Sequence, residues 1–151
     1  MQYHARFTSN LKADRGELWC WITSVKGISN GMSPLLRMTV PQGVTGLESF
    51  PFELDTPMFR SWLLLFKVIP FDYSDFSLER IDPKESFVEK SSMGSMRTWK
   101  HVRRISPCKN GHTLTDELSF EPRLAGWLTN KIVRFFFEHR HRQLKQHFGI
   151  A

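Results

Sequence analysis

The residue types best suited to chemistry are a histidine and an aspartate, His101 and Asp116, on two neighbouring predicted strands. Residues 96–105 and 112–120 each alternate between apolar and polar side chains, and both residues fall on the apolar sides. If those sides face a core, a connection of five or six residues would place the two side chains opposite or diagonal to each other, within reach. A tighter turn at Asn110-Gly111 would instead shift the register by several residues and separate them.

An imidazole beside a carboxylate is compatible with two roles. In a catalytic site the carboxylate orients the imidazole, which acts as an acid or base or donates to a ligand carbonyl. In a core, the same pair satisfies two buried polar groups and fixes the strand register. His101 and Asp116 are therefore candidate catalytic residues, and both roles stay open. Arg103, on the same side as His101, is suited to a ligand carboxylate or to pairing with Asp116 or Glu89.

The other possible metal ligands and nucleophiles form no recognisable site. His139 and His141 are two residues apart on a predicted helix, about 200° around its axis, so they cannot chelate one ion. We interpret both as surface imidazoles, with His139 at the core margin. The spacing of Cys20 and Cys108 fits no zinc site, and Cys20 is interpreted as a small buried hydrophobe. With no glycine-rich phosphate loop and no nucleophile elbow, the sequence predicts neither a metal nor a cofactor.

Hydrophobic periodicity outlines the elements that must position these residues. In chain order they are a strand over 3–9, a helix over 14–25 capped by Asp14, a short helix or turn over 27–34, a strand over 35–40, an irregular flap over 41–57, strands over 60–69, 73–81, 86–93, 96–105 and 112–120, and a long helix over 123–148. Strands joined as hairpins, with helices segregated to the ends, predict the α+β class.

The predicted C-terminal helix has a wide apolar arc made of two stripes. The first stripe comprises Leu124, Leu128, Ile132, Phe135, Phe136 and His139, and the second comprises Val133, Phe137, Leu144 and Phe148. The remaining face carries Trp127, Lys131, Arg134, Glu138, His141 and Lys145. Such an arc predicts a helix gripped on two sides, by a curved sheet and by the short helices near the N-terminus.

Length and composition favour one domain over residues 1–151. The chain is 40% hydrophobic, and it carries 21 Lys and Arg against 15 Asp and Glu, a net charge of +6. Basic residues concentrate in 97–109 and 123–147, which we interpret as solvated surface; a contact with nucleic acid or a membrane surface is not the expected role. Without an apolar leader or a run of about 18 apolar residues, a soluble cytoplasmic protein is expected. The oligomeric state is not predictable.

Several motifs carry a resemblance to a known superfamily. They are Arg37-Met38-Thr39, residues 61–66 with 70–73, residues 87–93, Trp99-Lys100-His101, Arg103-Arg104-Ile105, Thr115-Asp116, residues 120–123, residues 137–141 and Leu144. In this order they resemble the START-like, or SRPBCC, ligand-binding superfamily, in particular its small uncharacterised bacterial members. The resemblance implies a helix-grip fold, with a curved antiparallel sheet around the C-terminal helix. Val102 departs from the acidic residue that the pattern expects after the histidine.

The resemblance also implies a function. Most members bind apolar or amphipathic ligands in a cavity between sheet and helix, and a minority are cyclases, dehydratases or hydrolases. We therefore expect a binding protein for a small hydrophobic or amphipathic ligand, or alternatively a cyclase or dehydratase that uses His101 and Asp116. The residues expected to line the cavity are Trp62, Leu64, Phe66, Trp99, His101, Arg103, Leu114, Asp116, Leu118, Phe120, Leu128, Ile132, Phe135 and Phe136. Large aromatic side chains can frame such a cavity or fill it.

Overall fold

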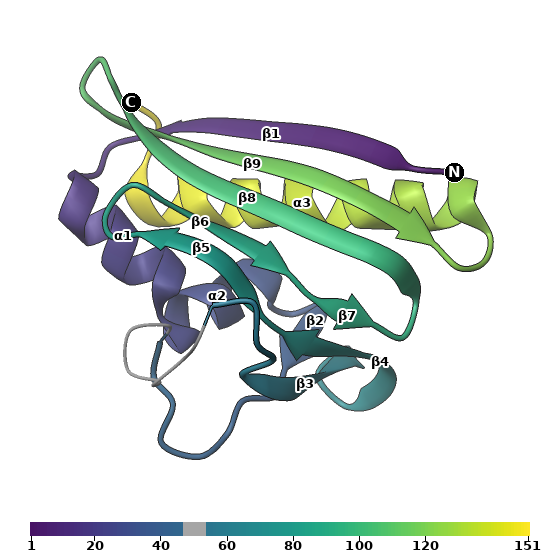
Figure 1. Ribbon diagram of the computed structural model, residues 1–151. Helices are drawn as coiled ribbons and strands as arrows, with labels where there is room; N and C mark the ends of the chain where they lie inside the picture. Colours follow the sequence, from purple (N-terminus) through teal and green to yellow (C-terminus); the bar gives the residue numbers. More distant parts are fainter. Residues whose placement is uncertain (47–53) are drawn as a thin grey trace.

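The computed structural model in Figure 1 describes residues 1–46 and 54–151. Its elements, in order, are β1 (Tyr3–Leu11), α1 (Arg15–Thr23), α2 (Val25–Met32), β2 (Leu36–Met38), β3 (Phe59–Leu65), β4 (Ile69–Phe76), β5 (Leu78–Asp82), β6 (Ser86–Lys90), β7 (Ser92–Met93), β8 (Met96–Cys108), β9 (Gly111–Pro122) and α3 (Gly126–Phe148). The predicted α+β class, with two short helices after the first strand and a long C-terminal helix, is confirmed. Part of the expected flap, residues 47–53, lies outside the described residues.

The described strands form two antiparallel sheets. The larger has the order β1-β9-β8-β6-β5, and the smaller has the order β2-β3-β4-β7. Helix α3 runs along one face of the larger sheet, and α1 and α2 lie near the C-terminal end of α3 (Figure 1). None of the helices in the described residues is long and apolar enough to cross a membrane.

Two predicted strands are each divided between the sheets. The predicted strand over 73–81 breaks at Ser77 into β4 and β5, and the one over 86–93 breaks at Ser91 into β6 and β7. The two serines lie together, because the Ser77 amide donates to Ser91 Oγ at 3.3 Å. Both are buried and small, so the chain can cross there from one sheet to the other. A serine inside an alternating segment gives no sequence signal for such a crossing.

The turn between β3 and β4 lies earlier in the chain than predicted. The predicted strand over 60–69 ends at Leu65, where Phe66 and Lys67 adopt positive φ angles of 50° and 69°. Neither residue is typical of a turn, so the sequence predicted none at this point. The hairpin leaves Phe66, Val68 and Ile69 more than half exposed, at 59%, 73% and 53%.

The two N-terminal helices meet at a shared cap, Ser24. Asp14 caps α1 as predicted and accepts from the Glu17 amide at 2.6 Å. Ser24 ends α1 at Thr23 and caps α2, accepting from the Gly27 amide at 3.0 Å. A Cβ on Gly27 would lie 1.9 Å from the Trp21 carbonyl oxygen, so only glycine permits this approach of the two helices. Cys20 is exposed, not buried as expected, because α1 buries the face carrying Leu18 and Ile22.

Helix α3 buries three of the four residues of its second predicted stripe, and Phe148 at its end is only partly buried. Val133, Phe137 and Leu144 are buried against the larger sheet, together with His141. Leu128, Ile132 and Phe135 of the first stripe are 44%, 44% and 50% exposed. The helix is therefore gripped mainly by the sheet, and its first stripe borders solvent and the cavity described next.

Candidate functional site

A cavity of about 370 Å³ lies between the two sheets, α2 and α3. Its wall is overwhelmingly apolar. The main contributors are Val25, Ile28 and Met32 of α2, Leu36, Met38, Leu63, Phe71 and Phe76 of the smaller sheet, Phe87 and Trp99 of the larger sheet, and Ile132, Val133, Phe136 and Phe137 of α3. The polar lining residues include His101, Arg103, Ser74, His139 and Arg140, together with two carboxylates, Asp72 and Glu89.

Only some of the residues expected to line this cavity do so. Trp99, His101, Arg103, Ile132 and Phe136 are among the described lining residues. Leu114, Asp116, Leu118 and Phe120 are at most 2% exposed and lie in the sheet beneath α3, outside the described lining.

The remaining expected lining residues point elsewhere. Trp62, Phe66, Leu128 and Phe135 are 44% to 59% exposed, and Leu64 is half-buried outside the lining. On β3 it is Leu63 that lines the cavity. Because neighbouring residues of a strand face opposite sides of the sheet, the prediction of Trp62 and Leu64 chose the wrong side of this strand.

The structure brings His101, Arg103 and Asp116 into direct contact. Cys108 pairs with Gly111, so β8 and β9 are joined by a two-residue turn. This turn places Arg103 opposite Asp116 and His101 two pairs away, on the diagonal. His101 Nε2 donates to Asp116 Oδ1 at 2.6 Å, and Arg103 donates from Nε and Nη2 to the two carboxylate oxygens at 2.7 and 2.9 Å. Neither predicted connection is observed: the turn is shorter than five or six residues, and its central residues are Lys109 and Asn110, not Asn110 and Gly111. This register keeps His101 diagonal to Asp116 and within reach.

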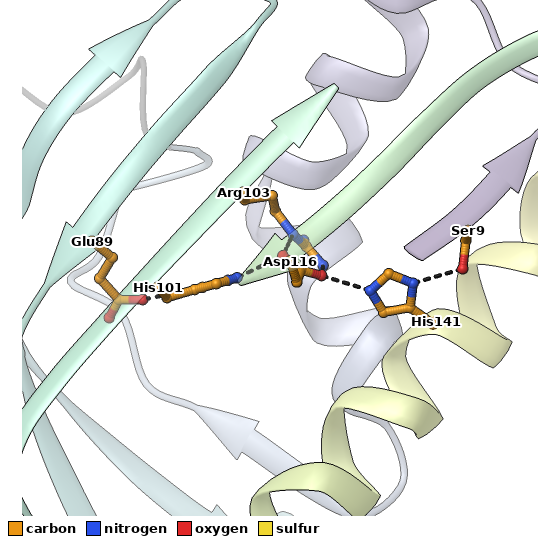
Figure 2. Close-up of polar contacts among 6 residues, drawn as sticks. All are labelled: Ser9, Glu89, His101, Arg103, Asp116 and His141. Carbon is orange, nitrogen blue, oxygen red and sulfur yellow. Dashed lines mark hydrogen bonds and ion pairs between the residues drawn. The ribbon is translucent and has the colours of Figure 1, made fainter. Parts of the chain in front are cut away.

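The carboxylate has a fourth donor on the long helix, His141. Figure 2 shows its ring between Asp116 and Ser9: Nε2 lies 2.7 Å from Asp116 Oδ2 and Nδ1 lies 2.6 Å from Ser9 Oγ. His141 is only 5% exposed, so its prediction as a surface imidazole was wrong. At 100° per residue it lies about 40° from Phe137, inside the buried arc; this spacing was the signal that could have identified it.

The network continues to β6 through His101. Its Nδ1 lies 3.6 Å from Glu89 Oε1 (Figure 2). Glu89 Oε2 in turn accepts from Ser91 Oγ at 2.8 Å. Contacts from Glu89 through His101, Asp116 and His141 to Ser9 therefore link β6, β8, β9, α3 and β1.

Three groups of this network have shifted pKa values. Burial alone would raise the pKa of Asp116, but the charges of Arg103 and His101 and hydrogen bonds from both histidines hold it well below its ordinary value. Burial likewise opposes ionisation of Glu89, but hydrogen bonds, foremost that from His101, lower its pKa. Burial lowers the pKa of His141, and Asp116 offsets this only in part. The two carboxylates are therefore ionised and His141 is neutral at pH 7.

Three members of this network, Glu89, His101 and Arg103, line the cavity, and each of them already has partners within the network. Ser9, His141 and Asp116 have the order of a nucleophile, base and acid, but none of the three is among the described lining residues, and Ser9 is 2% exposed. His101 does line the cavity, yet both of its ring nitrogens face carboxylates. In the described residues, no group of three His, Cys, Asp or Glu is placed to hold a metal ion.

Two polar residues of the cavity wall were missed by sequence reasoning. Ser74 Oγ is buried and has no hydrogen-bond partner among the described residues. Arg140 is half-buried and lines the cavity from α3. Neither stands in a motif, and alternation alone does not distinguish a cavity wall from a packed core.

Comparisons with known proteins agree on the fold. A family model described as a domain of unknown function, DUF8410, matches residues 9–148. No curated protein matches the sequence.

Solved structures match over nearly the whole chain. Protein CV1439 from Chromobacterium violaceum is 10% identical, with a TM-score of 0.74 and coverage of 98% of both chains. The AHSA1 (SPO3351) protein from Silicibacter pomeroyi is 12% identical, with a TM-score of 0.69 and 96% of both chains covered. Ara h 8.0201 is 9% identical, with a TM-score of 0.66 and 97% of both chains covered. These neighbours confirm the predicted helix-grip fold of the START-like superfamily.

Proposed function

The chain belongs to the DUF8410 family, and we propose that this member binds a small hydrophobic or amphipathic molecule in the cavity between its sheets and helix α3. The observation that carries the proposal is the cavity itself, about 370 Å³ with an overwhelmingly apolar wall. Protein interiors are normally close-packed, and ligand sites typically enclose roughly 300–1,000 Å³. A space of this size and character suits an apolar ligand.

Two further observations support the proposal. START-like proteins generally bind hydrophobic ligands, and the chain has their fold. In addition, Ser74 Oγ lies buried in the cavity wall without a hydrogen-bond partner among the described residues. Buried polar atoms are usually paired, so a polar group on the ligand would complete this site.

The alternative function, a cyclase or dehydratase with His101 and Asp116 as acid and base, receives less support. Such an enzyme needs a ring nitrogen that exchanges a proton with the substrate. Both nitrogens of His101 already face carboxylates, and Asp116 is 0% exposed. The pair is better suited to holding β8, β9 and α3 together beneath the cavity.

The neutral fluorescent probe N-phenyl-1-naphthylamine tests the proposal in solution. Wild type is expected to bind it saturably, with one site per chain. Ile28→Trp places a larger side chain in the cavity wall and should weaken binding at least about tenfold, a loss of roughly 1.4 kcal/mol. Lys26→Trp, on the exposed face of the same helix, is the matched control and should bind as wild type does. Absence of saturable binding, or equal binding by Ile28→Trp, would contradict the proposal.

A further inference from the structure

Arg140 is the most C-terminal of the α3 residues that line the cavity. Thr129, Val133, Phe136 and Arg140 all line the cavity. Their spacing of four, three and four residues places them on one face of a helix. Three of these positions carry the small or apolar side chains that such a wall favours. The fourth carries a permanent positive charge.

The side chain is held in place by α2 and by an aromatic ring. A Cβ on Gly31 would lie 3.7 Å from Arg140 Cγ and 3.8 Å from its Nε, so the arginine lies against the glycine's bare face. The guanidinium carbon lies 4.8 Å from the centre of the Phe137 ring. Two neighbours of Arg140 on the helix, His139 and Gln143, donate to the Ser33 carbonyl at 2.8 and 3.1 Å. These hydrogen bonds fix α2 against α3.

The carboxylates nearest to this charge already have partners. Asp116 accepts from Arg103, His101 and His141, and Glu89 faces His101 and accepts from Ser91. In the part of the chain that the structure describes, no hydrogen bond or ion pair reaches the Arg140 guanidinium.

The guanidinium of Arg140 keeps its proton, and no carboxylate among the described residues pairs with it. Burial, followed by the charge of Arg103, lowers the pKa of Arg140 to about 10, although Asp116 and Glu89 act in the opposite direction. Arg140 is therefore charged at neutral pH and lacks a counterion within this part of the chain, and a half-buried charge of this kind favours an anionic partner.

We infer that Arg140 binds the carboxylate of an amphipathic ligand whose apolar part fills the cavity; the inference rests on the proposed function. The guanidinium fork matches a carboxylate with two parallel hydrogen bonds. A single carboxylate also balances the single charge. A phosphate ester would bring more charge and more acceptors than this wall supplies, since its other polar atoms are few.

The test measures how well decanoic acid and decanamide displace N-phenyl-1-naphthylamine. Decanamide has the same chain length as decanoic acid and a neutral headgroup of similar shape. Wild type is expected to bind decanoate roughly ten- to a hundredfold more tightly than decanamide, the range for a charge-assisted hydrogen bond. In Arg140→Met that preference should disappear, while decanamide affinity stays within about threefold of wild type. Arg140→Lys should keep a reduced preference, and Arg142→Met, which removes an exposed arginine of the same helix, should keep all of it.

Each failure has its own signature. If the probe and decanamide bind but decanoate has no advantage, or keeps it in Arg140→Met, the role of Arg140 is wrong and the proposed function stands. If neither the probe nor either decanoyl compound binds wild type, the proposed function fails and the inference fails with it. Probe binding by Arg140→Met shows that its cavity is intact, so a folding defect cannot imitate the expected result.

Discussion

His141 Nε2 lies 2.7 Å from Asp116 Oδ2, so a buried hydrogen bond joins the C-terminal half of the long helix to β9 of the larger sheet. The carboxylate accepts from three side chains of two elements, and none of the three is more than 5% exposed. This contact fixes the side of α3 that faces the sheet, and it thereby determines which residues of the helix face the cavity.

Asp116→Asn should destabilise the protein strongly. The amide has the carboxylate's shape but leaves Arg103 as a buried charge without its partner. Breaking a buried pair in this way typically costs about 3–5 kcal/mol, measurable as the free energy of unfolding in urea. Glu117→Gln, which affects only partly exposed pairs with Arg6 and Arg104, should cost less than about 1 kcal/mol. Equal effects of the two substitutions would refute the structural role of Asp116.

Acidification should destabilise the protein through His141. Burial lowers the pKa of folded His141 below its ordinary 6.5, so the unfolded chain binds the proton first as the pH falls. The stabilisation is therefore complete above pH 6.5 and is lost as the pH falls through the folded pKa. Asp116 and Glu89, with lowered pKa values, contribute with the same sign at lower pH.

Urea unfolding at a series of pH values measures this dependence. His141→Gln should remove the part of the decrease that begins below pH 6.5. His4→Gln, at an exposed histidine of β1, is the matched control for replacing a histidine by glutamine. A wild-type profile in His141→Gln would show that His141 is not the group that titrates.

Two serines that face each other on β3 and β4 offer a matched comparison. Ser61 Oγ donates to the Thr39 carbonyl at 2.7 Å, whereas Ser74 Oγ has no partner among the described residues. Ser61→Ala should therefore lower the free energy of unfolding by about 1 kcal/mol, and Ser74→Ala should leave it unchanged or raise it. Thermal and urea unfolding of the ligand-free proteins measure both. A loss in Ser74→Ala as large as that in Ser61→Ala would mean that Ser74 is already satisfied.

Gly27→Ala should disturb the cavity from a distance. The added methyl group would overlap the Trp21 carbonyl, so α2 must shift, at a cost of about 1–3 kcal/mol, and probe affinity should fall with it. Gly16→Ala in α1 is the control: its Cβ meets nothing closer than 3.7 Å, and a gain of up to about 1 kcal/mol is expected. Unchanged probe binding in Gly27→Ala would show that the position of α2 does not control the cavity.

The sequence was informative on β8 and β9, where the polar residues that alternation places on the buried side also bond to one another. Contacts of His101 and of Arg103 with Asp116 were each among the alternatives that the sequence left open, and the structure has both. Alternation fails where a strand changes sheets at a small residue, as at Ser77, because the pattern continues across the break. It also cannot tell which side of an apolar strand faces a cavity, so Leu63 was overlooked in favour of Trp62.

Arg140 was beyond sequence reasoning for a different reason. An arginine on a basic helix normally indicates a solvated surface, and only the position of α2 shows that this one faces the cavity. His141, by contrast, was identifiable from helical geometry, because it follows Phe137 by four residues on the buried arc.

The most direct test of ligand binding is a ¹³C-methyl NMR titration of wild type with decanamide, whose neutral headgroup makes the result independent of Arg140. We expect saturable shift changes at the methyl groups of Ile28, Met38 and Val133, which line the cavity from three sides. The buried core methyl groups of Leu11 and Leu114, outside the described lining, should change little. Changes confined to the exposed methyl groups of Val68 and Ile69 on the β3–β4 hairpin, or no saturable change, would contradict ligand binding in the cavity.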